Sequence, residues 1–169
     1  MTAWQSISLA AILVLTSIGA ADGQQSASPV QKRAGASAVV QRIMSKAQSR
    51  WYSQVSGISR IRFEPATNDE VAEVKALGED AIPALEHYID LQPRDDFTQL
   101  IAVRFLTEIG SASALPALKK ALSHDQWEVT RAAALDGMFI ISPSEARSYV
   151  AAALTDGSAV VRQHARNLR

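Results

Sequence analysis

One motif recurs in this chain at a fixed distance. Residues 77–85 read LGEDAIPAL, residues 109–118 read IGSASALPAL, and residues 141–150 carry a degraded copy, ISPSEARSYV. Gly78, Gly110 and Ser142 lie 32 residues apart. A fixed period of this length indicates stacked helical hairpins, because a single hairpin cannot bury its apolar face and needs a neighbour to cover it. The sequence therefore predicts an all-α repeat domain.

Apolar spacing and turn residues place two helices in each repeat. The predicted pairs are 69–77 with 80–91, 98–109 with 113–122, and 127–140 with 144–154, followed by a lone helix at 158–168. Gly78, Gly110 and Gly157 fall in connections, where glycine adopts left-handed backbone at little cost. Pro83 and Pro116 fall in the first turn of a second helix, where the missing N–H costs little. Residues of equal register should share the core: Val74, Leu106 and Met138; Leu85, Leu118 and Val150.

These residues resemble HEAT repeats, especially the short HEAT-like class of phycobilisome lyases. The resemblance covers about residues 69–169 and rests on AIPAL at 81–85, ALPAL at 114–118, and D-x-x-x-V-x-R at 125–131 and 156–162. In the third repeat, Ser142 and Ser148 replace the glycine and the proline. The resemblance implies a right-handed α-solenoid in residues 67–169. It also implies that Asp125, Arg131, Asp156 and Arg162 cap helices and bond to the neighbouring repeat.

The N-terminus reads as a leader. Residues 7–20 form an uncharged, mostly apolar run that is shorter than the roughly 20 residues of a membrane span, and small residues follow it. This pattern is typical of a secretory signal peptide ending near residue 23, although residues 1–6 carry no Lys or Arg. We therefore expect residues 1–23 to be cleaved and the protein to be periplasmic or secreted. The alternatives are an uncleaved membrane anchor and a buried helix.

Charge is segregated between the next two segments. Residues 24–62 contain seven basic residues and no acid, whereas residues 63–96 contain ten acids and two bases. Residues 36–55 read as an amphipathic capping helix, and residues 57–65 read as an extended linker, so residues 24–66 precede the repeats. The helix carries Arg42, Lys46 and Arg50 on one face. This basic patch either faces the acids of the first repeat or meets an anionic partner or lipid headgroups.

No catalytic constellation is evident in the sequence. The chain has no cysteine, which excludes disulfides and thiolate chemistry, and no phosphate loop or nucleophile motif. Its histidines, His87, His124 and His164, show no metal-ligand spacing, and we expect no metal or other cofactor. The formal net charge is zero, so nucleic acid is not an expected partner.

The resemblance implies that second helices line a concave face that binds proteins or peptides. Outward positions on these helices form a candidate groove whose charge runs from acidic to basic: Glu86, His87, Asp90, Lys119, Lys120 and Arg147. An ordinary solvated surface is the simpler interpretation of the same residues. Weak self-association is a further expectation, because the final helix carries more apolar residues, Val160 among them, than one buried face uses.

Three functions follow from these patterns. The first is an exported, non-catalytic protein-interaction or scaffold module. The second is a lyase-like enzyme or enzyme subunit, as the resemblance to phycobilin lyases suggests. The third is a membrane-tethered adaptor that keeps its leader. Fold alone does not decide between them, because function resides in sites and not in folds.

Overall fold

The computed structural model describes residues 27–55, 66–91, 95–123 and 125–169. In these ranges the regular secondary structure is helical, without strands, which confirms the predicted all-α class. The elements in chain order are α1 (Pro29–Val55), α2 (Asn68–Leu77), η1 (Gly78–Ala81), α3 (Ile82–Asp90), α4 (Asp96–Ile109), η2 (Ala112–Ala114), α5 (Leu115–Ala121), α6 (Glu128–Ile141), α7 (Pro143–Ala153) and α8 (Ala159–Asn167). The leader, the 57–65 linker and His124 lie outside the described residues.

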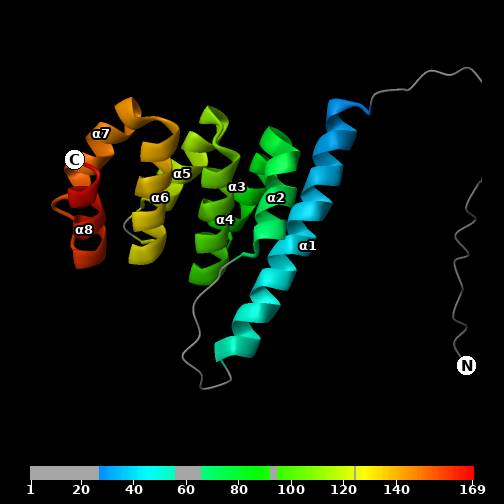
Figure 1. The fold of residues 1–169 in the computed structure, drawn as a ribbon, viewed down its shortest axis with the longest axis horizontal. Helices are drawn as coiled ribbons and strands as arrows, with labels where there is room; N and C mark the ends of the chain where they lie inside the picture. The colour runs from blue at the N-terminus through cyan, green and yellow to red at the C-terminus, as the bar shows by residue number, and fades with distance from the viewer. Residues whose placement is uncertain (1–26, 56–65, 92–94, 124) are drawn as a thin grey trace, which may run out of the picture.

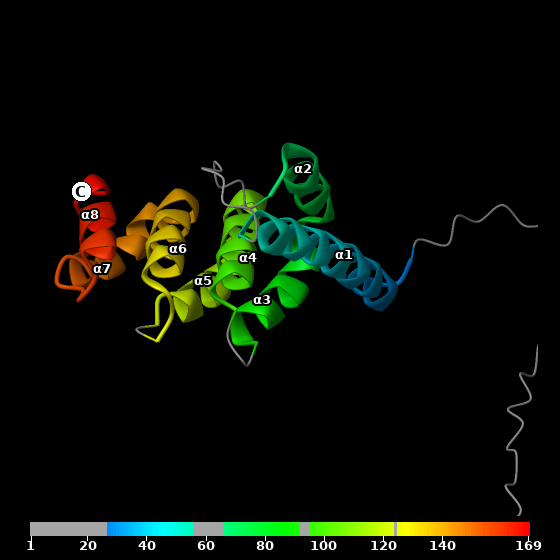
Figure 2. The same cartoon turned by 90° about the horizontal axis from the view of Figure 1, so that it is seen from below.

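The helices stack in chain order along the long axis of the molecule. Helices α1 and α2 lie at one end and α7 and α8 at the other (Figure 1). The first helices of the repeats are α2, α4 and α6, and the second helices are α3, α5 and α7; Figure 2 shows α3 and α5 on one side of the row of first helices. Helices α4 and α6 share the most extensive contact between elements. This is the stack of helical hairpins that the 32-residue period predicts.

Local signals set the helix ends as predicted, with one exception. Thr67 caps α2 in a reciprocal capping box with Glu70. Gly78 and Gly110 adopt positive φ angles of 57° and 71°, which favour glycine. The prediction was wrong for Gly157, which lies in a connection but has no positive φ. There, Ser158 caps α8 by accepting from the backbone N–H of Val160, so a left-handed residue is not needed.

The third repeat makes its turn with fewer residues. In the first two repeats a short 3₁₀ turn precedes the second helix. Pro83 and Pro116 lie in the first turn of the second helices α3 and α5. In the third repeat Ser142 alone separates α6 from α7, and Pro143 begins α7. The proline supplies a preset φ angle at a position whose N–H would be unpaired, so the degraded motif still ends one helix and begins the next.

Residues of equal register form a continuous core. Val74, Leu106 and Met138 are fully buried, as are Leu85 and Leu118. The same cluster of buried residues extends from α1 through α6 and reaches Ala146 of α7. The predicted burial is therefore confirmed for these residues. Val150 is also buried, but it packs in a second cluster with Leu135 and Ala165 and not in the cluster of Leu85 and Leu118.

Helix α1 is longer than predicted. It begins at Pro29, seven residues before the expected start at Ala36. Ser28 caps it: the Ser28 hydroxyl accepts from the Gln31 backbone N–H, and the Gln31 side chain accepts from the Ser28 backbone N–H. The added turns are exposed and carry no apolar row, so the period that marks buried helices was absent there. Further along, Val40, Ile43 and other apolar residues of α1 enter the core shared with the repeats.

Candidate partner-binding surface

The candidate groove residues lie on the three second helices. Glu86, His87 and Asp90 belong to α3, Lys119 and Lys120 to α5, and Arg147 to α7. Because the second helices follow one another in the stack, the acidic and basic residues face each other across neighbouring repeats. The structure thus brings most of the set together, although their role in partner binding remains a prediction.

An ion-pair cluster joins α3 to α5. The ammonium of Lys120 donates to Glu86 Oε1 at 2.6 Å and to Asp90 Oδ2 at 2.9 Å. These bonds, that to Glu86 first, raise the pKa of Lys120. The three side chains remain substantially exposed, so their main effect is to fix positions and not to add much stability. The two acids of α3, Glu86 and Asp90, therefore pair with a base of the second repeat.

A second ion pair joins α5 to α7. Here the earlier helix supplies the base and the later helix supplies the acid, the reverse of the pairing between α3 and α5. Lys119 donates to Glu145 Oε1 and lies 6.0 Å from the ring centre of Tyr149. The hydrogen bond with Glu145 raises the pKa of Lys119. Sequence reasoning did not select Glu145, because the residue that meets Lys119 depends on the rotation between repeats. We call these two contacts, Glu86/Asp90 with Lys120 and Lys119 with Glu145, the charge rungs.

Arg147 differs from the other charged groove residues. Within the described part of the chain, no hydrogen bond or ion pair joins its guanidinium to another residue. Arg147 is exposed and lies two positions beyond Glu145 on α7, so the two side chains project from nearly opposite sides of that helix. It therefore faces away from α5, toward the C-terminal end of the stack.

His87 borders a cavity between α1 and α3. This cavity has a volume of about 420 Å³, and Arg33, Asp80 and Tyr88 also line it. Arg33 Nε lies 3.9 Å from Asp80 Oδ1, so the cavity presents both signs of charge. Burial raises the pKa of the Tyr88 hydroxyl. The lining offers hydrogen-bonding groups without selecting one class of ligand.

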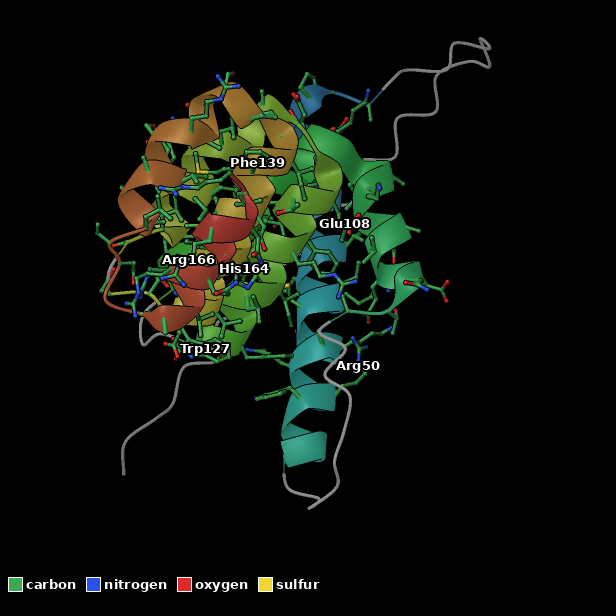
Figure 3. All side chains as sticks on the ribbon, turned by 60° about the vertical axis from the view of Figure 1, so that its left-hand side comes forward. Arg50, Glu108, Trp127, Phe139, His164 and Arg166 are labelled. Carbon is green, nitrogen blue, oxygen red and sulfur yellow. The ribbon has the colours of Figure 1, made fainter. Side chains whose placement is uncertain are left out.

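The basic helix docks on the acidic first repeat, as one of the two interpretations of its charge predicts. Arg50 forms a bidentate pair with Glu70, both nitrogen–oxygen distances being 2.6 Å, and Arg42 pairs with Glu73 (Figure 3 shows Arg50 on α1). Burial raises the pKa of Glu70, but hydrogen bonds from Arg50 and Thr67 outweigh it, and the net pKa is lowered. Lys46 is exposed. Two of the three members of the basic patch thus pair with acids of the same chain.

A buried ion pair joins α6 to the connection between α7 and α8. Arg131 Nη2 donates to Asp156 Oδ1 at 2.7 Å, and both side chains are more than nine-tenths buried. The same oxygen accepts from the Ser158 backbone N–H at 2.7 Å, and Arg162 donates to the Asp156 carbonyl. This geometry confirms the structural interpretation of Arg131, Asp156 and Arg162.

Two contacts had no clear signal in the sequence. His164 Nδ1 on α8 lies 2.8 Å from Asp136 Oδ2 on α6, and Figure 3 labels His164 on α8. Gln48 of α1 donates to Asp95 and Thr98 at the start of α4 at 2.9 and 2.7 Å. Both contacts join different elements of the fold. They depend on how one element is rotated against the other, and the repeat period in the sequence does not specify this rotation.

Among the described residues, no group of three or more His, Asp and Glu side chains is arranged to hold a metal ion. In the same part of the chain, no helix is both long and apolar enough to cross a membrane.

Stacked hairpins with inter-repeat polar contacts define a helical repeat protein. Residues 91–169 match the family model for HEAT repeats, which covers α4 to α8. The match supports the resemblance to HEAT repeats, but it does not distinguish the phycobilisome-lyase class. Searches of curated proteins and of solved structures find no match to this chain.

Proposed function

We propose that this protein is an exported, non-catalytic interaction module that binds another protein or a peptide across its second helices. HEAT repeats commonly mediate protein–protein interaction, and residues 91–169 are similar to them. The observation that carries the proposal is the pair of charge rungs. They hold acidic and basic groups at fixed positions on the exposed second helices, and a surface ordered before binding loses less entropy when a partner docks.

The finer features of the fold belong to the same proposal. A right-handed solenoid follows from the resemblance to HEAT repeats. The contacts of α1 with α2, α3 and α4 support a role for this helix as the N-terminal cap of the stack. The apolar residues 7–20 and the small residues after them support export to the periplasm or the exterior.

Site-specific photo-crosslinking tests the proposal. A photoreactive residue replaces His87 on α3 or, as a control, the exposed Ala76 on α2. After irradiation in the native envelope or secretome, we expect the same protein adducts to form repeatedly from the α3 position and not from α2. Equal adducts from both positions, or none from either, would contradict binding at the second helices.

Two alternatives make different predictions. A lyase-like enzyme would bind a chromophore or turn it over, which absorbance spectroscopy of the purified chain with added bilin would detect. A membrane-tethered adaptor would retain residues 1–23, whereas N-terminal sequencing of an exported protein should find a start near residue 24. Self-association through α8 is a further proposal, supported by Val160, which is 39% exposed.

A further inference from the structure

An apolar hollow lies at the C-terminal end of the stack. It has a volume of about 330 Å³ and is bounded by α6, α7 and the end of the chain beyond α8. Its apolar lining includes Phe139, Val150, Leu154 and Leu168, and Arg147 and Arg169 complete it without any carboxylate side chain. Figure 3 views the stack with this end forward and shows Phe139 near one end of α6. The hollow thus combines apolar side chains with positive charge.

The register of the repeats identifies what kind of element fits this hollow. Glu86, Lys119 and Ala151 occupy equivalent positions, 33 and 32 residues apart. Glu86 on α3 contacts the next second helix, α5, and Lys119 on α5 contacts the next one, α7. Ala151 on α7 lines the hollow. The hollow is therefore the place at which a following second helix would pack.

The charge beside the hollow indicates the sign of that element. At both charge rungs, neighbouring second helices meet through opposite charges. On the far side of α7, the exposed α7 side chain beside the hollow is Arg147, a base. The complementary element would carry carboxylates, because like charges brought together at an interface disfavour binding.

Charge also argues against a second copy of this chain in the hollow. A two-fold contact through the hollow would bring Arg147 of both copies into one interface, with no carboxylate side chain lining the hollow to offset them. A head-to-tail contact would bring α1 onto the hollow, and described residues 27–50 contain five bases and no acid. A flat lipid surface would leave the hollow unfilled, whereas a side chain projecting from a helix would fill it.

We propose that this hollow binds an acidic amphipathic helix of a partner protein. One large apolar side chain of that helix enters the hollow, and a carboxylate of the same helix pairs with Arg147. This proposal rests on the proposed function and adds the site and the chemistry of the partner. It predicts binding that combines apolar burial with a marked dependence on salt.

A synthetic peptide tests the proposal with the full chain. The probe is a fluorescent helix of about five turns with one row of leucines flanked by glutamates, and the matched peptide has lysine in place of every glutamate. Fluorescence anisotropy measures both dissociation constants. We expect the acidic peptide to bind at least about tenfold more tightly, and this preference to fall in salt on the order of 0.5 M.

Two variants locate the binding site. Arg147→Glu reverses the unpaired charge, and Ala151→Trp fills the hollow from an exposed position, so neither removes a core side chain. We expect each to weaken acidic-peptide binding about tenfold. The matched controls are Lys32→Glu on α1 and Ala76→Trp on α2, which should change binding less than about twofold. Circular dichroism checks that all four variants keep the helical fold.

Specific outcomes would overturn the proposal. Equal binding of the acidic and basic peptides would do so, as would variants that behave like their controls. Preferential binding to phosphatidylglycerol vesicles that depends on Arg147 would assign the hollow to a membrane. Dimerisation in sedimentation that is lost in Arg147→Glu would assign it to a second copy. If protein adducts form at position 87 but the acidic peptide does not bind at the hollow, this inference fails and the proposed function stands. If neither crosslinking position yields adducts, the proposed function fails.

Discussion

The pairing of Glu70 with Arg50 makes the docking of α1 measurable. Glu70 has two roles: its carboxylate accepts two hydrogen bonds from Arg50, and it closes the capping box of α2 through the Thr67 backbone N–H. Glu70→Gln keeps an oxygen that can close the capping box but removes the ion pair. Glu70→Ala removes both contacts. The two variants therefore separate docking from capping.

The burial of the pair sets the expected magnitude. The Glu70 side chain is 11% exposed, but that of Arg50 is 33% exposed and can regain water when its partner is lost. We therefore expect Glu70→Gln to cost about 1–2 kcal/mol, less than the loss of one partner from a fully buried pair. Glu70→Ala should cost about 1 kcal/mol more, the usual value of a lost cap. Urea unfolding followed by circular dichroism gives both values.

The pH dependence provides an independent check. The pKa of Glu70 in the folded protein is lowered, so its ionised form stabilises the fold at pH values above the unfolded pKa of about 4.3. This stabilisation is lost as pH falls through the lowered folded pKa. The difference between the wild type and Glu70→Gln should thus be constant near neutral pH and shrink in acid. Asp69→Asn, an exposed change on the same helix, is the control; a difference no larger than that of the control, or one that grows in acid, would refute the reasoning.

Three further predictions concern the repeats and the final helix. Leu85→Ala should cost about 2–5 kcal/mol in urea unfolding because the side chain is fully buried, whereas Glu86→Ala on the exposed rung should cost under about 0.5 kcal/mol; equal losses would show that the helix phase is wrong. Asp156→Ala should cost about 3–5 kcal/mol because it leaves Arg131 buried without this carboxylate, and adding Arg131→Met should recover part of the loss; no recovery would contradict the coupling. Val160→Glu should abolish any concentration-dependent association seen by sedimentation, and a strict monomer before and after the change would remove the basis for self-association through α8.

Much of the fold could be predicted because its determinants are local and periodic. The 32-residue register placed the helices of the repeats within about two residues of their observed starts, and it identified Leu85, Leu118 and Met138 as core residues. Thr67 and Pro83 marked helix starts through their own chemistry. The start of α1 was missed because its exposed first turns carry no apolar row, although Ser28, Pro29 and Gln31 supply a capping signal.

The candidate surface was predicted less completely. Outward positions on second helices could be named from register alone, but their pairing could not, because it depends on the rotation of one hairpin against the next. For this reason Glu145 was missed as the partner of Lys119. Arg147 was grouped with the other basic residues, whereas its side of α7 faces the C-terminal hollow. The 32-residue period also did not predict the close approach of α4 and α6 at Gly137. A β-carbon there would lie 2.2 Å from Thr107 Oγ1.

The alternating signs of the charge rungs constrain how such an array could grow during evolution. Duplicating the first repeat alone would place Glu86 and Asp90 against the copy of His87, which occupies the position of Lys120. Duplicating the second would place Lys119 against the copy of Lys120. The first junction would lose an existing ion pair, and the second would add repulsion between like charges. Duplicating the first two repeats as a unit would keep the opposite charges that pair α3 with α5. At the new junction it would also place lysines of one unit beside acids of the next unit, so the two units would attract each other. Growth by pairs of repeats is therefore electrostatically easier than growth by single repeats, and the order of the hairpins carries information that their shared hydrophobic pattern does not.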